Sequence, residues 1–181
     1  MTSPWSVADQ KMLFHDSASK SMREKFPSMV DECVEWMNGH YPEVDFGVIK
    51  WWLVGGQVKS QYNHETQEIK ICHHGGIYFY ARACREIPRL KEIVGVYHAE
   101  VGTSTSIIHE LTHHVQYARD FHKGNETDTT LNELCWLQER HPAIYARCFT
   151  RNPPTVGPAP IRPRAKGEPL PPYMCKPRRA R

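Results

Sequence analysis

Long apolar runs are missing from this sequence. No stretch approaches the roughly 18 to 20 consecutive apolar residues that span a bilayer, so a transmembrane protein is excluded. Residues 1–11 also lack the basic start followed by an apolar segment of roughly 7 to 15 residues that typifies a secretory signal. We therefore expect a cytoplasmic protein that makes no contact with a membrane.

Closely spaced cysteines are missing as well. The six cysteines lie far apart and never form a C-x-x-C pair, which gives no support to a zinc ribbon or a thioredoxin-like site. Without an export signal, free thiols are expected rather than a disulfide framework. The six are Cys33, Cys72, Cys84, Cys135, Cys148 and Cys175.

The charge is divided unevenly along the chain. Residues 151–181 hold eight Lys and Arg against one acid, a net charge of +7, and since the whole chain carries +3, residues 1–150 carry −4. The same segment holds nine of the fourteen prolines. We expect this tail to be extended and to bury no core. It would contact an acidic partner or nucleic acid, or act as a flexible solubilising end.

The body of 150 residues is long enough for one core. Residues 1–42 are predicted to be helical, with a helix that opens at Pro27 and ends at Gly39, and a weaker helix near residues 7–14. Residues 43–150 are predicted to form one domain. Residues 151–181 form the tail.

Residues 44–101 have the composition of strands. Val44–Val54 is rich in β-branched and aromatic residues and ends at a Gly-Gly turn. Residues 57–62 and 66–72 flank Asn63-His64-Glu65, which indicates a hairpin. Because the connections are short, the small sheet is predicted to be mostly antiparallel.

Helical patterns return after Gly102. Thr103 or Ser104 can cap a helix that ends near Gly124, and Asp128 or Thr129 can cap a second helix that ends near residue 140. A last short helix is expected over residues 142–149. The fold class is therefore α+β.

The first of these helices carries an H-E-x-x-H motif, His109-Glu110-Leu111-Thr112-His113. Residues i and i+4 share one helix face, so both imidazoles can reach a single Zn²⁺. Glu110 lies about 100° around the helix, where it can reach a water molecule and act as general base. His114 points off this face, toward solvent or a supporting position.

A catalytic zinc needs a third protein ligand. The metzincin pattern fails, because Gln116 and Arg119 stand where it requires Gly and His. Glu133, on the next predicted helix, is the favoured third ligand. The alternatives are Glu126, Asp128, Glu139 and His122.

The H-E-x-x-H motif followed by Asn132-Glu133 resembles the zinc metallopeptidases of the thermolysin-like gluzincin type. The resemblance covers roughly residues 44–149. It implies a minimal zincin-like fold in which the active-site helix precedes a helix that carries the third zinc ligand.

This resemblance implies Zn²⁺ on His109, His113 and Glu133, with Glu110 as general base. It also implies that residues 92–98 form a strand that pairs with an extended peptide or protein substrate. Leu137 stands where the thermolysin-like enzymes place an Asp, and the downstream domain that supplies their oxyanion donors has no counterpart. The candidate donors are His141 and Tyr145, with His122 and Tyr117 as alternatives.

Cys72-His73-His74 with Cys84 could form a second metal site. Adjacent residues on a strand face opposite sides of the sheet, so polar residues at a strand end are the favoured interpretation.

The predicted function is therefore zinc-dependent hydrolysis of peptide bonds. One alternative is a structural or interaction protein on a peptidase-like scaffold, such as a subunit of a virion or another large assembly, with the basic tail as its binding element. The other is a nucleic-acid-associated protease.

Overall fold

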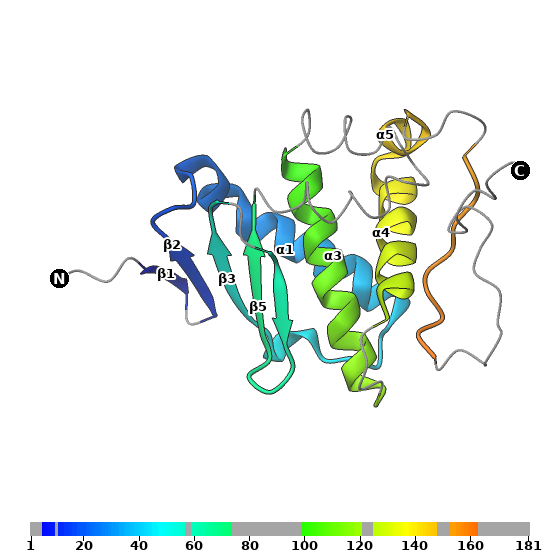
Figure 1. Ribbon diagram of the computed structural model, residues 1–181, viewed down its shortest axis with the longest axis horizontal. Coiled ribbons are helices and arrows are strands. Elements are labelled where there is room, and N and C mark those ends of the chain that lie inside the picture. Colours follow the sequence, from blue (N-terminus) through cyan, green and yellow to red (C-terminus); the bar gives the residue numbers. More distant parts are fainter. Residues whose placement is uncertain are drawn as a thin grey trace, which may run out of the picture.

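The computed structural model describes residues 5–9, 11–56, 59–73, 99–120, 125–147 and 153–162. Within these ranges the chain forms an α+β fold in which a small sheet lies on one side of helix α3 and helix α4 lies on the other (Figure 1). Helix α3 spans Ala99–Ala118 and α4 spans Glu126–Arg140. The short α5, Pro142–Arg147, follows α4. The α+β class is confirmed.

The N-terminus is not a pair of helices. Trp5–Asp9 (β1) and Met12–His15 (β2) form an antiparallel pair, so the prediction of a helix near residues 7–14 is wrong. In β2, Met12 and Phe14 are buried and alternate with half-buried neighbours, which is the period of a strand. A run this short does not distinguish helix from strand by its composition.

Helix α1 spans Lys20–His40 and begins earlier than expected. Ser19 caps it by accepting a hydrogen bond from the Met22 amide, and Pro27 lies inside the helix rather than at its start. Its Phe26 side chain packs edge-on against two rings of the sheet, those of Phe14 and Trp51. This contact fixes α1 on one face of the sheet.

The sheet has the order β1-β2-β3-β5-β4. Strands β3 (Lys50–Val54), β4 (Gln61–Asn63) and β5 (Glu68–Cys72) complete it, and a short 3₁₀ turn over Phe46–Val48 precedes β3. The predicted hairpin is confirmed between β4 and β5, with Asn63 Oδ1 accepting backbone hydrogen bonds in the turn.

The sheet is mixed, so the prediction of a mostly antiparallel sheet is wrong. Two of its four pairings, β2 with β3 and β3 with β5, are parallel. The 21-residue helix α1 supplies the first crossover, and the edge strand β4 supplies the return that makes β5 parallel to β3. The segment between each pair of parallel strands therefore contains the crossover that parallel pairing requires.

Helices α3 and α4 pack against each other and run in opposite directions (Figure 1). Helix α3 starts at Ala99, before the expected cap, and α4 is capped by Asn125 rather than by Asp128 or Thr129. The apolar stripe of α3 is fully buried, and it includes Ile107, Ile108 and Leu111. No helix in the described ranges is long and apolar enough to cross a membrane.

Residues 153–162, here named the strap, run along α4 without helix or strand (Figure 1). The lack of a regular element in this described part of the tail agrees with expectation. The expectation that the tail buries no core is wrong here, because Val156, Ala159 and Ile161 are each only 3% exposed. The basic residues 163–181 lie outside the described part of the chain.

Candidate metal centre

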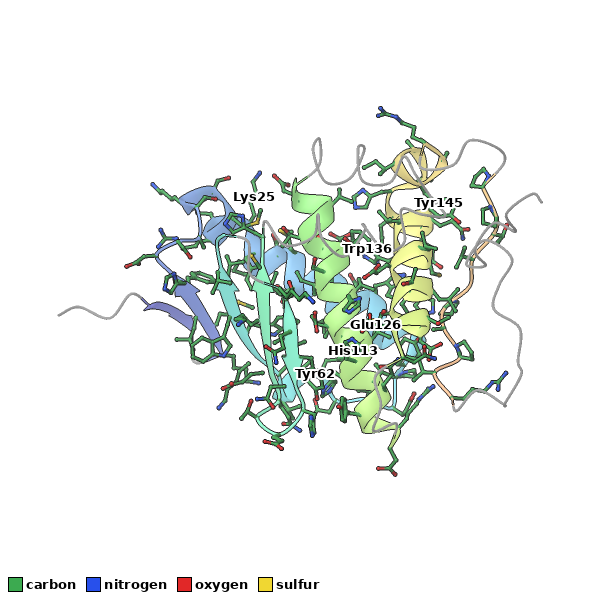
Figure 2. The ribbon with its side chains drawn as sticks, in the orientation of Figure 1. Lys25, Tyr62, His113, Glu126, Trp136 and Tyr145 are labelled. Atoms are coloured by element: carbon green, nitrogen blue, oxygen red, sulfur yellow. The ribbon has the colours of Figure 1, made fainter. Side chains whose placement is uncertain are left out.

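The two motif histidines meet on one face of α3. His109 Nε2 and His113 Nε2 lie 3.1 Å apart, and the rings are almost perpendicular. The spacing of four residues places the two side chains one turn apart, as expected for i and i+4 on a helix. Figure 2 shows His113 beside Glu126, on the side of α3 that faces α4.

The other nitrogen of each ring contacts an oxygen atom of a neighbouring side chain. His113 Nδ1 lies 2.9 Å from Gln116 Oε1, and His109 Nδ1 lies 2.9 Å from Glu133 Oε1. The orientation of the Gln116 amide is fixed, because its Oε1 accepts from the Asn125 amide and its Nε2 donates to the Asn125 carbonyl. His113 Nδ1 therefore carries the proton, which leaves its Nε2 lone pair directed into the centre.

Glu126 brings a carboxylate to these Nε2 atoms from the first turn of α4. Its Oε2 lies 3.6 Å from His109 Nε2, and its Oε1 lies 3.8 Å from His113 Nε2. Ligands about 2.0 to 2.1 Å from a tetrahedral metal are about 3.3 Å from one another. The three side chains therefore form a group that could hold a metal ion.

Glu133 lies on the opposite side of the His109 ring. The sequence favours Glu133 as third ligand, but the structure places its Oε1 against Nδ1, whereas Glu126, an alternative on sequence grounds, lies near Nε2. Glu133 is 1% exposed, and its Oε2 has no hydrogen-bond partner among the described residues. Burial, with the negative charges of Glu126 and Glu110, raises the pKa of Glu133 well above its usual value.

Glu110 is a buried acid next to the first motif histidine. Burial raises its pKa to about 8, and the nearby charge of Glu126 acts in the same direction. A backbone hydrogen bond from Tyr62, on the edge strand β4, partly opposes that rise in pKa. Burial also lowers the pKa of His109 well below its usual value, and the neighbouring His113 adds to the effect. A cation bound beside Glu110 would lower the pKa of that carboxyl again.

The predicted oxyanion donors lie elsewhere. His141 follows the end of α4 and packs against Trp136, and the Tyr145 hydroxyl donates to the Pro154 carbonyl. On this helix Glu133, which contacts His109, precedes His141 by eight residues, about 12 Å at about 1.5 Å per residue. The structure does not bring His141 and Tyr145 to the histidine pair.

Two other acids that the sequence offers as ligands have structural contacts. Asp128 accepts from Asn125 Nδ2 at the start of α4. Glu139 accepts from Trp36 Nε1 near the other end of that helix. These contacts account for the positions of both side chains without a metal.

His114 and Tyr117 join α3 to the edge of the sheet. His114 is buried rather than solvent-facing: its Nε2 donates to the Asp45 carbonyl, and its Nδ1 lies 2.9 Å from the Tyr62 hydroxyl. Burial lowers the pKa of this imidazole. Tyr117 stacks on His64 with ring centroids 4.3 Å apart.

Several sequence predictions fall outside the described residues. They concern His122 as a ligand or donor, the substrate-pairing strand at residues 92–98, and the partners His74 and Cys84 of the second metal site. Cys72, the described cysteine of that second site, is buried, and its Sγ contacts the Gly56 carbonyl.

The role of Gln116 was not predicted from the sequence. In the sequence, Gln116 is noticed only as a mismatch to the metzincin pattern. In the structure its side chain orients His113 and joins α3 to the start of α4. The available signal was a polar residue three positions after His113, on the same helix face.

Comparison with protein-family models, with curated protein sequences and with solved structures finds no match.

Proposed function

We propose that the chain is a zinc-dependent metallopeptidase. The observation that carries the proposal is the pairing of His109 Nε2 with His113 Nε2 at 3.1 Å, with Glu126 beside both and Glu110 next in sequence. Two imidazoles and a carboxylate are the donor set of a catalytic zinc, which keeps a fourth position open.

The surrounding contacts support a metal site. Gln116 Oε1 accepts from His113 Nδ1, and the Glu133 carboxylate would accept from His109 Nδ1 once a metal occupied His109 Nε2. Such partners orient a ligand ring and raise its basicity. Glu133 Oε2, which has no hydrogen-bond partner among the described residues, also fits a metal site, because a cation on His109 would favour the carboxylate form of Glu133.

A bound Zn²⁺ would supply a Lewis acid that polarises a carbonyl and lowers the pKa of water. The chain supplies the proton transfers. Glu110, as a carboxylate, takes a proton from the water that attacks the peptide carbonyl carbon. It then delivers that proton to the leaving amide nitrogen as the carbon–nitrogen bond breaks, so the base is regenerated.

The test combines metal content with a peptide-library assay. The purified chain should contain about one zinc and cleave peptides. Glu110→Gln should keep the zinc and lose cleavage, because a neutral amide of the same size cannot accept the proton. Glu24→Gln, at an exposed glutamate of α1, is the matched control and should behave as the wild type.

A folded wild-type chain that takes up no zinc, even from excess zinc, would refute the proposal. Full zinc occupancy with equal cleavage by the wild type and Glu110→Gln would refute the role of Glu110. Zinc occupancy without cleavage of any peptide would instead favour a structural protein on a peptidase-like scaffold.

A further inference from the structure

The strap is hydrogen-bonded to α4 at two places. Gln138 holds Val156 by a pair of bonds, its Nε2 donating to the Val156 carbonyl and its Oε1 accepting from the Val156 amide. Further along, the Ala159 amide donates to Asn132 Oδ1 over 2.8 Å. Only the second attachment, at Asn132, continues through a further hydrogen bond to α3.

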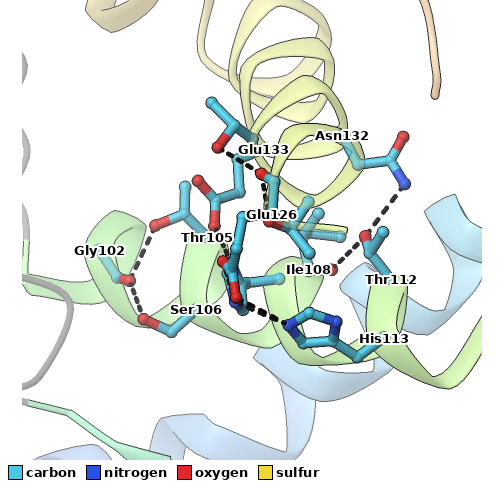
Figure 3. A network of polar contacts seen from close by, with 12 residues as sticks. Gly102, Thr105, Ser106, Ile108, Thr112, His113, Glu126, Asn132 and Glu133 are labelled. Carbon is cyan, nitrogen blue, oxygen red and sulfur yellow. Dashed lines mark hydrogen bonds and ion pairs between the residues drawn. The ribbon is translucent and has the colours of Figure 1, made fainter. Parts of the chain in front are cut away.

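Asn132 connects the strap to the motif helix. This side chain is fully buried, and its Nδ2 donates to Thr112 Oγ1 over 3.0 Å. Thr112 in turn donates to the Ile108 carbonyl (Figure 3). The Tyr41 hydroxyl, just beyond α1, lies within 3 Å of both Asn132 Oδ1 and the Ala159 carbonyl. A buried hydrogen-bonded network of this kind fixes a unique arrangement.

The strap also reaches the end of α3. Arg119 Nη1 lies 3.2 Å from the Pro160 carbonyl and 3.3 Å from the Ile161 carbonyl. Residues 159–161 therefore contact the ends of α1 and α3 and the middle of α4. The pair of bonds between Gln138 and Val156 lies outside this network.

We propose that the strap is a positioning element of the metal centre and that it acts through Asn132 and Thr112. The inference rests on the proposed metal site, whose ligands come from both helices, His109 and His113 from α3 and Glu126 from α4.

The metal centre depends on the register of α4 against α3, because both helices supply its ligands. A shift of α4 along α3 would change the distance from Glu126 to the two imidazoles. The bond between Asn132 and Thr112 opposes that shift. The strap holds the Asn132 amide in the orientation that makes this bond, because the Ala159 amide donates to Oδ1 and leaves Nδ2 for Thr112.

The test measures zinc affinity and metal-free stability for four variants of the full chain. Thr112→Val removes the acceptor for Asn132 at nearly constant volume, and Thr112→Ser keeps it. Tyr41→Phe removes the hydroxyl shared by Asn132 and the strap. Gln138→Leu is the matched control, because it detaches the strap at Val156 and leaves Asn132 untouched.

We expect Thr112→Val to weaken zinc binding about tenfold, the lower end of the range for groups that support metal ligands. Thr112→Ser should restore the affinity, and Tyr41→Phe should weaken it in the same direction. Gln138→Leu should lower thermal stability without changing zinc affinity. By linkage, zinc should also slow amide hydrogen exchange at Ala159.

Equal zinc affinity in the wild type, Thr112→Val and Tyr41→Phe would overturn the inference and leave the metal site standing. Equal losses in Thr112→Val and Gln138→Leu would also overturn it, because the effect would then follow general stability. If Thr112→Val does not fold, Tyr41→Phe and the Ala159 exchange rate decide. Absence of zinc from the wild type would instead refute the proposed function itself.

Discussion

Substitution of Glu126 should remove a metal ligand, whereas substitution of Glu133 should remove a group that only orients one. Glu126 lies 3.6 and 3.8 Å from the two Nε2 atoms, and Glu133 lies 2.9 Å from His109 Nδ1. Glu126→Gln and Glu133→Gln have the same chemistry, so their comparison isolates the effect of position.

The expected losses follow from the energetics of zinc sites. A four-ligand structural site binds zinc with an apparent free energy of about 10 to 16 kcal/mol, which is about 3 kcal/mol for each ligand. Glu126→Gln should therefore weaken zinc binding roughly 100-fold or more. Glu133→Gln should weaken it by about 10- to 100-fold, the range for an orienting partner.

The metal-free chain should respond differently. Glu126 has a side chain that is 59% exposed, so its substitution should change the free energy of unfolding by less than about 1 kcal/mol, mainly through the lost charge at the start of α4. Glu133 is buried, and one of its oxygens has no hydrogen-bond partner in the described part of the chain, so a neutral amide there should not destabilise the metal-free fold strongly.

The assay is competition with a chromophoric chelator near neutral pH, with urea denaturation of the metal-free variants beside it. Full zinc affinity in Glu126→Gln together with loss of binding in Glu133→Gln would contradict this assignment. That outcome would restore Glu133 as the third ligand that the sequence favours.

Three further predictions concern the surroundings of the centre. Gln116→Leu should weaken zinc binding about 10- to 100-fold, measured by the same competition, because His113 loses its Nδ1 acceptor; unchanged affinity would contradict the supporting role. Burial lowers the pKa of His114, so below about pH 6.5 the unfolded chain binds a proton that the folded chain resists, and stability is lost as the pH falls. The difference in unfolding free energy between the wild type and His114→Gln should therefore shrink from about pH 7.5 to about pH 5.5, measured in urea titrations with chelator present. A constant difference would show that protonation of His114 does not cause the loss of stability. Gly55→Ala should destabilise the fold by about 2 kcal/mol or more in thermal denaturation, because the added Cβ would lie 2.0 Å from the Ser17 carbonyl oxygen. A wild-type melting temperature would show that the backbones at Gly55 and Ser17 separate easily.

The strong local patterns of the sequence predicted the elements around the site. Helices α3, α4 and α5, the β4–β5 hairpin and the shared face of His109 and His113 all follow from short-range spacing. Such features depend on residues within about four positions of one another, so they are visible without a partner segment.

The mispredicted features have a common physical origin. Strand β2 has too few residues for its sequence to distinguish a strand from a helix, and its extended form depends on its parallel partner β3. The order of the strands likewise depends on α1 and β4 acting as crossovers. Contacts between distant segments decide these features, and no local pattern specifies them.

The helical spacing of the motif was enough to place two imidazoles on one face, with the carboxyl group of Glu110 beside them in sequence. It was not enough to choose the acid that approaches them, because Glu126 and Glu133 lie two turns apart on the same side of α4. The packing of α4 against α3 places the first at Nε2 of His109 and the second at Nδ1. Spacing along the chain restricts the candidates, and the distance between two helices selects among them.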